Sequence, residues 1–150
     1  MIGYQEENSK EELKRVDHLI YVSLKYTRTC DVIKNVIKRL ISAFNYKIND
    51  IVRYAKEKGK IKDMPISMKE KLEIVNKLMS KVGSAKYVKL YELLKMIDIA
   101  ECERKCEFRK HVVLIAKVKN KKVPVKVDTL LKYFEQTKEF VNIADKWMKR

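Results

Sequence analysis

Glycine, proline and cysteine are scarce in this 150-residue sequence, which holds 3 Gly, 2 Pro and 3 Cys. So few turn-forming residues exclude an all-β fold with many hairpins and favour long helices. An odd number of cysteines does not predict a disulfide framework in a chain of this size, and we expect reduced thiols. The sequence also lacks an apolar run of membrane-spanning length and a secretory signal, which predicts a cytoplasmic protein without a membrane partner.

The motifs of several enzyme classes are missing as well. The sequence has no Gly-rich phosphate loop, no paired carboxylates in a convincing cleft, and no Ser, His and Asp arrangement. It therefore gives no support to a kinase, a hydrolase or a dehydrogenase, and it predicts no cofactor.

Basic residues, by contrast, are abundant. The chain has 35 Lys and Arg against 20 Asp and Glu, a net charge of +15, which attracts polyanions in general. About half of this excess fits a heat-adapted composition rich in charged residues. The location of the charge is more informative, because residues 110–127 contain six lysines and no acid.

Apolar residues recur every three to four positions along most of the chain, as expected for helices with one buried face. The longest series runs from Ile33 to Ala55, and Gly59 can end such a helix in a left-handed conformation. Serines followed three residues later by glutamate have the spacing of capping boxes. We expect helices from Ser9 to Tyr26, along Ile33–Ala55, from Ser67 to Gly83, from Ser84 past Arg104, and from the cap Asp128 onward, with a break at 27–29.

The periodicity changes at His111. The segments HVVLIAKV and VPVKV are rich in β-branched residues and flank a polar turn at 119–122, which predicts a β-hairpin. Pro124 cannot donate a ladder hydrogen bond, so its strand should lie at a sheet edge. The fold predicted is mainly α: residues 1–150 form a single domain, an antiparallel bundle of four to five helices with a β-hairpin inserted before the last helix.

Arg104 and His111 are separated by six residues, at the junction between the fourth helix and the hairpin. In a basic helical domain this pair resembles the HEPN superfamily, whose nuclease members use Arg, four to six residues, then His. The likeness covers most of the chain in topology and only these two residues in motif. The segment 16–44, VDHLIYVSLKYTRTCDVIKNVIKRLISAF, is also similar to uncharacterised archaeal helical proteins, which implies a fold family and no activity.

The HEPN resemblance implies a metal-independent ribonuclease, in which a homodimer pairs two sites around RNA. His111 would act as general base or acid, and Arg104 would neutralise the charge of the phosphorane. Such an enzyme would be the toxin half of a pair, with a protein partner that the sequence does not identify. The alternative for His111 is a structural histidine that bonds a backbone carbonyl at a strand start.

Two cysteines lie close to the same histidine. Cys102, Cys106 and His111 could supply three soft ligands for zinc, but a tetrahedral site needs a fourth ligand and none is evident. We therefore predict no metal, and we expect the thiols to pack as small apolar groups.

The lysines of the predicted hairpin offer a different function. A flexible, basic tip could contact several phosphates and release their counterions. Lysines and proline on an edge strand also discourage aggregation between sheets, which is the alternative role. The predicted nucleic-acid-binding residues are Arg109, Lys110, Lys117, Lys119, Lys121, Lys122 and Lys126.

Three functions thus remain from the sequence. The first is binding of RNA, or another polyanion, through the Lys-rich hairpin. The second is the HEPN-like ribonuclease that uses Arg104 and His111. The third is a structural or assembly module in which the charge only maintains solubility.

Overall fold

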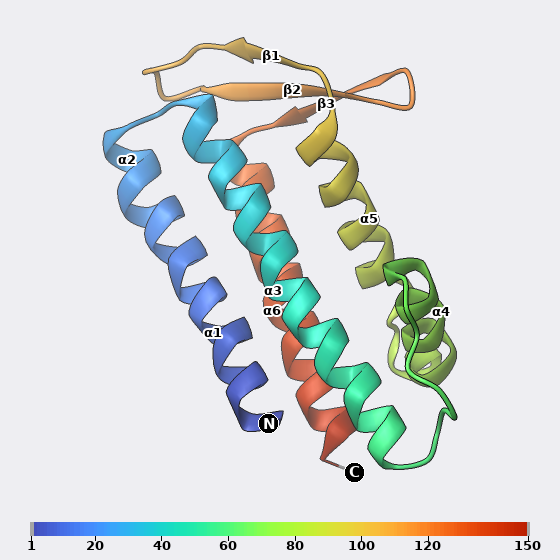
Figure 1. The fold of residues 1–150 in the computed structure, drawn as a ribbon. Coiled ribbons are helices and arrows are strands. Elements are labelled where there is room, and N and C mark those ends of the chain that lie inside the picture. Colours follow the sequence, from blue (N-terminus) through green and yellow to red (C-terminus); the bar gives the residue numbers. More distant parts are fainter. Residues whose placement is uncertain (1, 150) are drawn as a thin grey trace.

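The computed structural model describes the backbone of residues 2–149 and the side chains of residues 9–149. Helices α1, α3, α5 and α6 run along a bundle, and a small sheet lies across one end of it (Figure 1). The elements are α1 (Ile2–His18), a π-helical segment η1 (Leu19–Ser23), α2 (Leu24–Tyr26), α3 (Cys30–Glu57), α4 (Met68–Met79), a 3-10 turn η2 (Ser80–Val82), α5 (Ala85–Ile99), β1 (Cys102–Lys105), β2 (Val113–Val118), β3 (Lys121–Val125) and α6 (Val127–Met148). The predicted fold class, mainly α with β structure before the last helix, is confirmed.

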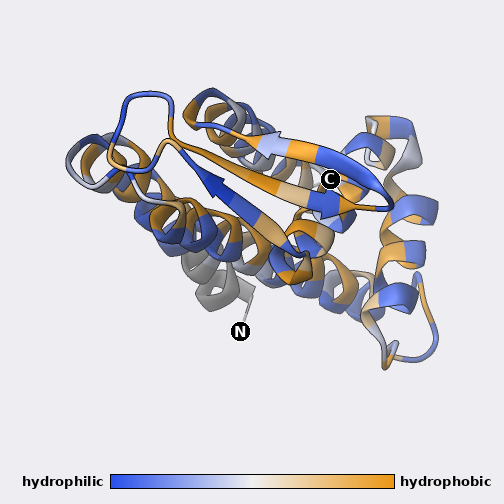
Figure 2. Ribbon diagram, turned by 90° about the horizontal axis from the view of Figure 1, so that it is seen from above, coloured by the Kyte–Doolittle hydropathy of each residue, from blue (hydrophilic) through white to orange (hydrophobic). Residues whose placement is uncertain are grey.

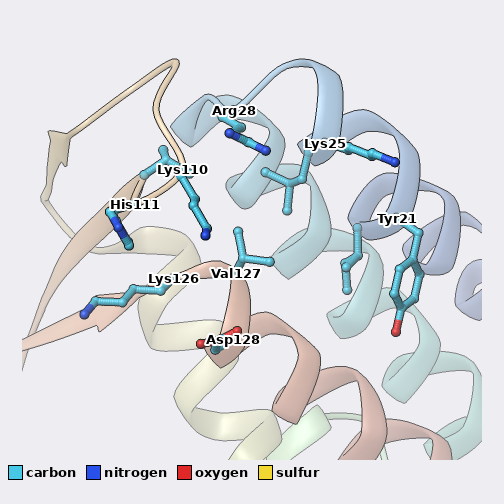
Figure 3. Close-up of a pocket in the computed structure, with 11 residues that line it drawn as sticks. Tyr21, Lys25, Arg28, Lys110, His111, Lys126, Val127 and Asp128 are labelled. Atoms are coloured by element: carbon cyan, nitrogen blue, oxygen red, sulfur yellow. The ribbon is translucent and has the colours of Figure 1, made fainter.

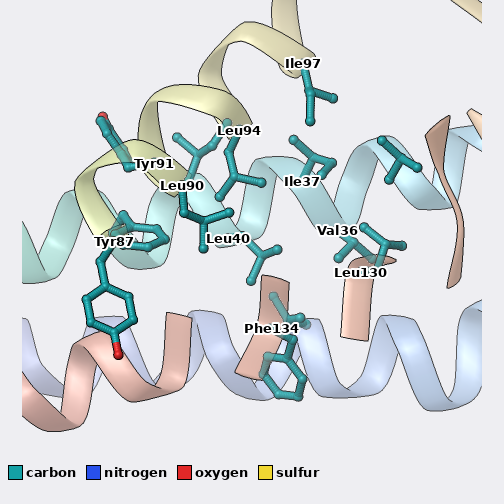
Figure 4. Packing of buried hydrophobic residues seen from close by; sticks show 14 of the residues in the cluster. Val36, Ile37, Leu40, Tyr87, Leu90, Tyr91, Leu94, Ile97, Leu130 and Phe134 are labelled. Carbon is teal, nitrogen blue, oxygen red and sulfur yellow. The ribbon is translucent and has the colours of Figure 1, made fainter. Parts of the chain in front are cut away.

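Helix α3 forms the centre of the core. Its apolar side chains repeat at helical spacing and pack between α5 on one side and α6 on another (Figure 4). Val36, Ile37 and Leu40 are at most 1% exposed, as are Leu94 of α5 and Leu130 of α6. Burying each such side chain contributes about 1.5–3 kcal/mol, so this helix fixes the position of its neighbours.

Several predicted helix boundaries are confirmed. Thr29 ends the break after α2, because its hydroxyl accepts a hydrogen bond from the Val32 amide at the start of α3. Gly59 follows α3 with a φ of +71°, in the left-handed region that favours glycine. Ser67 caps α4 by accepting from the Glu70 amide.

The predicted start of the first helix at Ser9 is wrong. Helix α1 already begins at Ile2, so Ser9 lies inside it, and its hydroxyl donates to the carbonyl of Ala43 in α3. Glu12, which was expected to complete a capping box, is buried and pairs with Arg15 and Arg39. The serine and glutamate spacing therefore reflects contacts between α1 and α3.

The fourth helix does not pass Arg104 but ends at Ile99. Residues 102–105 form strand β1, which pairs antiparallel with β2, so the hairpin becomes a three-stranded sheet of order β1-β2-β3. The segment CERK has no β-branched residue, and pairing with β2 overrides its local preference. The last helix has Lys126 as its N-cap, and the predicted cap Asp128 lies in its first turn.

The hairpin between β2 and β3 is confirmed, with Pro124 on an edge strand. Its turn is shorter than predicted: Lys119 and Asn120 have φ of 48° and 65°, the pattern of a two-residue type I′ turn. Lys121 and Lys122 therefore belong to β3. Seen from above, β2 is largely hydrophobic and the turn is hydrophilic (Figure 2).

The sheet packs onto the end of the bundle through one face. Leu114, Ala116 and Val118 of β2, with Val125 of β3, are at most 9% exposed. The opposite face carries Lys117 and Lys122, which are exposed partners across the two strands. Among the described residues, no helix has the length and apolar character needed to cross a membrane.

Candidate polyanion-binding site

Arg104 has carboxylate partners. Its guanidinium lies 2.7 Å from Asp31 Oδ1, in the first turn of α3, and 3.9 Å from Glu107 Oε2. The hydrogen bond from Arg104, with the attraction between the two charges, holds the pKa of the Asp31 carboxyl below its usual value. Arg104 therefore joins strand β1 to the start of α3.

The loop between β1 and β2 is attached to the same region. The Glu107 carboxylate accepts a hydrogen bond from the Cys30 amide at 3.1 Å and so caps α3 from outside the helix. The Phe108 amide donates to the Arg28 carbonyl at 2.6 Å. These contacts hold the following residues, from Arg109 to Val112, beside the segment that joins α2 to α3.

A cavity of about 390 Å³ lies next to this loop. Three parts of the chain form it: the stretch from η1 through α2 to Arg28, the end of the β1–β2 loop, and the start of α6 (Figure 3). Its volume falls in the range of small-ligand sites. It is lined by Ile20, Tyr21, Leu24, Lys25, Arg28, Lys110, His111, Val112, Lys126, Val127 and Asp128.

Positive charge predominates in this cavity. Four Lys and Arg side chains line it against one carboxylate, Asp128. In the part of the chain whose side chains are described, none of these four cations lies within ion-pairing distance of a carboxylate. Lys110 reaches into the space between Arg28 and Val127, whereas Lys25 and Lys126 extend toward opposite sides (Figure 3). Unpaired cations around a cavity create a potential that attracts an anion.

The start of α6 adds to this potential. A helix N-terminus carries a partial positive charge and amide protons that lack helical partners. Its N-cap is usually Ser, Thr, Asp or Asn, whose side-chain oxygen accepts from one of these amides. Lys126, already one of the four lining cations, occupies this position and offers no such oxygen, while its own amide donates to the Thr129 hydroxyl at 3.2 Å.

His111 lines the cavity, but among the described lining residues Arg104 is not present. The two residues of the HEPN-like pair therefore lie in different surroundings: His111 faces the basic cavity, and Arg104 is bound to Asp31. The imidazole of His111 is exposed, in a turn two residues before β2.

The predicted nucleic-acid-binding residues are all exposed and fall into two groups. Lys110 and Lys126 line the cavity, with Arg109 beside them in the loop. Lys117, Lys119, Lys121 and Lys122 lie toward the hairpin turn. Lys121 and Lys126 are five residues apart on an extended segment, which places the two groups roughly 16 Å from each other. Of the seven, Lys122 has an ion-pair partner within the described part of the chain, Glu103 at 3.8 Å.

Sequence reasoning missed the contribution of the segment before α3, whose aromatic and basic lining residues are Tyr21, Lys25 and Arg28. They come from η1 and the segment after it, and π-helical turns in α-helices often occur at functional sites. The signal in the sequence is YVSLKYTR, in which aromatic and basic residues alternate. Tyr21 and Tyr26 are 54% and 79% exposed, although both lie in a helical segment that also contains buried apolar residues.

The two cysteines near the sheet are not placed as a ligand set. Cys102 is half-buried on β1 and its thiol donates to the Ala100 carbonyl, while Cys106 is exposed in a turn with a φ of 57°. The described residues contain no group of three His, Cys, Asp or Glu side chains suited to a metal.

In comparisons with protein-family models, curated proteins and solved structures, the chain matches none.

Proposed function

We propose that this chain binds single-stranded RNA at the end of the bundle that carries the sheet. The observation that supports this proposal is the cavity lined by Lys25, Arg28, Lys110 and Lys126, which have no ion-pair partners among the described side chains. Phosphates of a nucleic acid would supply the missing negative charge and release counterions on binding. The lysines near the hairpin turn extend this surface across the sheet.

Exposed aromatic rings favour a single strand over a duplex. Tyr21 is 54% exposed at the cavity, and Phe108 is 77% exposed in the loop just before Arg109 and Lys110. Unpaired bases can stack on such rings, whereas the bases of a duplex are not accessible to them. Stacking is tolerant of sequence, so we expect affinity for RNA in general and little base specificity.

The test is fluorescence anisotropy of a labelled single-stranded RNA at several salt concentrations. If four cations of this surface, in the cavity and near the hairpin turn, neutralise phosphate charge, log K should fall with log salt with a slope of about −2.8. Replacing Lys110 by glutamine (Lys110→Gln) should weaken binding roughly five- to tenfold and reduce the slope by about 0.7.

Lys89→Gln is the matched control, because Lys89 is exposed on α5 and does not line the cavity. It removes the same charge and should leave affinity and slope near their original values. Binding that is absent, insensitive to salt, or equally affected by the two substitutions would refute the proposal.

Tyr21 provides an independent test of base stacking. We expect Tyr21→Ala to weaken RNA binding by about 1–3 kcal/mol, the usual value for one stacked base. Tyr21→Phe keeps the ring and should bind like the original protein. Equal losses in both variants would assign Tyr21 a role through its hydroxyl and contradict stacking.

The ribonuclease, the homodimer and the assembly module implied or allowed by the sequence stay predictions. No contact in the described structure favours the ribonuclease, because Arg104 is paired with Asp31 outside the cavity that His111 lines. Incubation of RNA with the protein in chelator tests this activity directly. Cleavage that disappears in His111→Ala, with an unchanged melting temperature, would establish it.

A further inference from the structure

We infer that the cavity is the subsite for a terminal phosphomonoester of the bound strand. This inference rests on the proposed RNA-binding function and assigns one end of the RNA to one place on the protein. The cavity residues Arg28 and Lys110, with the start of α6, would contact the phosphate. The lysines near the hairpin turn would contact internal phosphates.

The charge of the cavity fits a monoester better than a diester. A phosphate within the chain of RNA carries one negative charge, whereas a phosphomonoester carries about −1.5 to −2 at pH 7 and three terminal oxygens. Four cations line the cavity against one carboxylate, an excess of three positive charges around it, although Lys25 and Lys126 extend toward its two sides (Figure 3). A single internal phosphate would neutralise about a third of that excess.

The backbone of Arg28 is held beside the cavity. Its side chain is half-buried, and its carbonyl is held by the Phe108 amide at 2.6 Å. A guanidinium donates two parallel hydrogen bonds to a phosphate, and because the backbone of Arg28 is already held, binding has only the side chain left to order. Lys110 extends toward the same space from the opposite segment (Figure 3).

The start of α6 is the third contributor. This helix is 22 residues long, and its N-cap Lys126 has no side-chain oxygen to accept from the first amides. A lysine at this position disfavours the helix through its dipole, and a bound anion would reverse that effect. Departures from local rules of this kind are concentrated at functional sites.

The remaining lining suits the nucleoside attached to that phosphate. Ile20, Leu24 and Val112 are buried apolar residues at the cavity, and the ring of Tyr21 lies at its side (Figure 3). An apolar floor beside a charged centre can hold a sugar and a base. A free phosphate would not use these residues.

The experiment compares one short RNA prepared with a 5′ phosphate, with a 3′ phosphate, or with hydroxyl groups at both ends. Binding to the full chain is measured by competition against one labelled RNA at fixed salt. We expect one phosphorylated form to bind about tenfold tighter than the hydroxyl form, from charge-assisted hydrogen bonds gained at the end. The form that binds tighter identifies which end the cavity takes.

Substitutions test whether the cavity causes the preference for RNA with a terminal phosphate. Arg28→Gln and Lys110→Gln should abolish it, whereas Lys119→Gln near the hairpin turn should weaken all RNA forms equally and keep it. Asp128→Asn should increase it by about three- to tenfold, because one repulsive charge beside the phosphate is removed. Lys110 is exposed, so its variant remains informative even if Arg28→Gln fails to fold.

The outcomes separate this inference from the proposed function. Salt-dependent binding with equal affinity for all three forms would overturn the terminal subsite and leave RNA binding intact. A preference that survives in both Arg28→Gln and Lys110→Gln would also overturn it, because the end would then bind elsewhere. Failure of every form to bind would refute the proposed function itself.

Discussion

Lys47 allows a quantitative test of how the bundle is held together. This lysine is fully buried in α3, with its Nζ 2.6 Å from Asp145 Oδ1 of α6 and 3.6 Å from Asp50 Oδ2 of α3. Asp50 is also fully buried. Removing one member of a buried ion pair is costly, because the charge that remains has already lost its hydration.

We expect Lys47→Met to lower the free energy of unfolding by about 3–5 kcal/mol. Methionine keeps the unbranched shape, so little of this loss should come from a cavity. Asp145→Asn should cost less, about 1–2 kcal/mol, because the amide oxygen still accepts from Lys47 and Asp50 remains as a counter-ion. The side chain of Asp145 is also 14% exposed, which lets water compensate.

Urea unfolding, followed by helical circular dichroism and by the fluorescence of Trp147, measures these differences. With an m-value of about 2 kcal/mol/M, Lys47→Met should lower the midpoint by roughly 2 M. The double variant should be more stable than the sum of the single losses predicts, by about 1 kcal/mol or more. A loss from Lys47→Met no larger than that from Asp145→Asn would refute the view that Lys47 is shared by two carboxylates.

Three further predictions concern the junction between the sheet and α3. Glu107→Ala should destabilise the protein by about 1 kcal/mol in the same urea assay, because the Cys30 amide loses its cap; unchanged stability would exclude this cap. Cys106 should react with a thiol reagent before Cys30, whose burial, with the nearby Glu107, raises its pKa; mass spectrometry would contradict this by showing Cys30 modified first. Arg104 lowers the pKa of Asp31 in the folded state, so the ion pair stabilises the fold fully above the usual Asp pKa of 3.8. This stabilisation is lost as pH falls through the pKa that Asp31 has in the folded protein. Arg104→Met should therefore remove this part of the pH dependence of the free energy of unfolding.

The helices could be predicted where the spacing of apolar residues and the residues at the helix ends determine the structure. The apolar period of α3 and the glycine after it fixed both its face and its end, because a helix buried on one side needs that period. Strand β1 could not be predicted in this way. Its residues Cys102–Lys105 form a strand because β2 offers them a partner, and β2 lies eight residues further along the chain.

The candidate site could be predicted only in part. The lysine density of residues 110–127 identified one wall of the cavity and the hairpin group. Lys25 and Arg28 belong to a helix end more than 80 residues away from Lys110, and only the fold brings them to the same cavity. The sequence YVSLKYTR shows that aromatic and basic residues alternate there. It does not show that Tyr21 and Tyr26 are exposed, because their exposure depends on the fold.

Arg104 and Arg28 illustrate why residue type does not decide function. Both lie near the same end of the bundle, and Arg104 stood out in the sequence through its spacing to His111. Arg104, however, is bound to Asp31 at 2.7 Å, so it would have to give up that carboxylate before it could bind a phosphate. Arg28 has no carboxylate partner in the described part of the chain, and it lines the cavity with its charge unpaired. The paired cations therefore stabilise the junction with α3, whereas the unpaired cations that line the cavity are those that can attract the polyanion that we propose as the ligand.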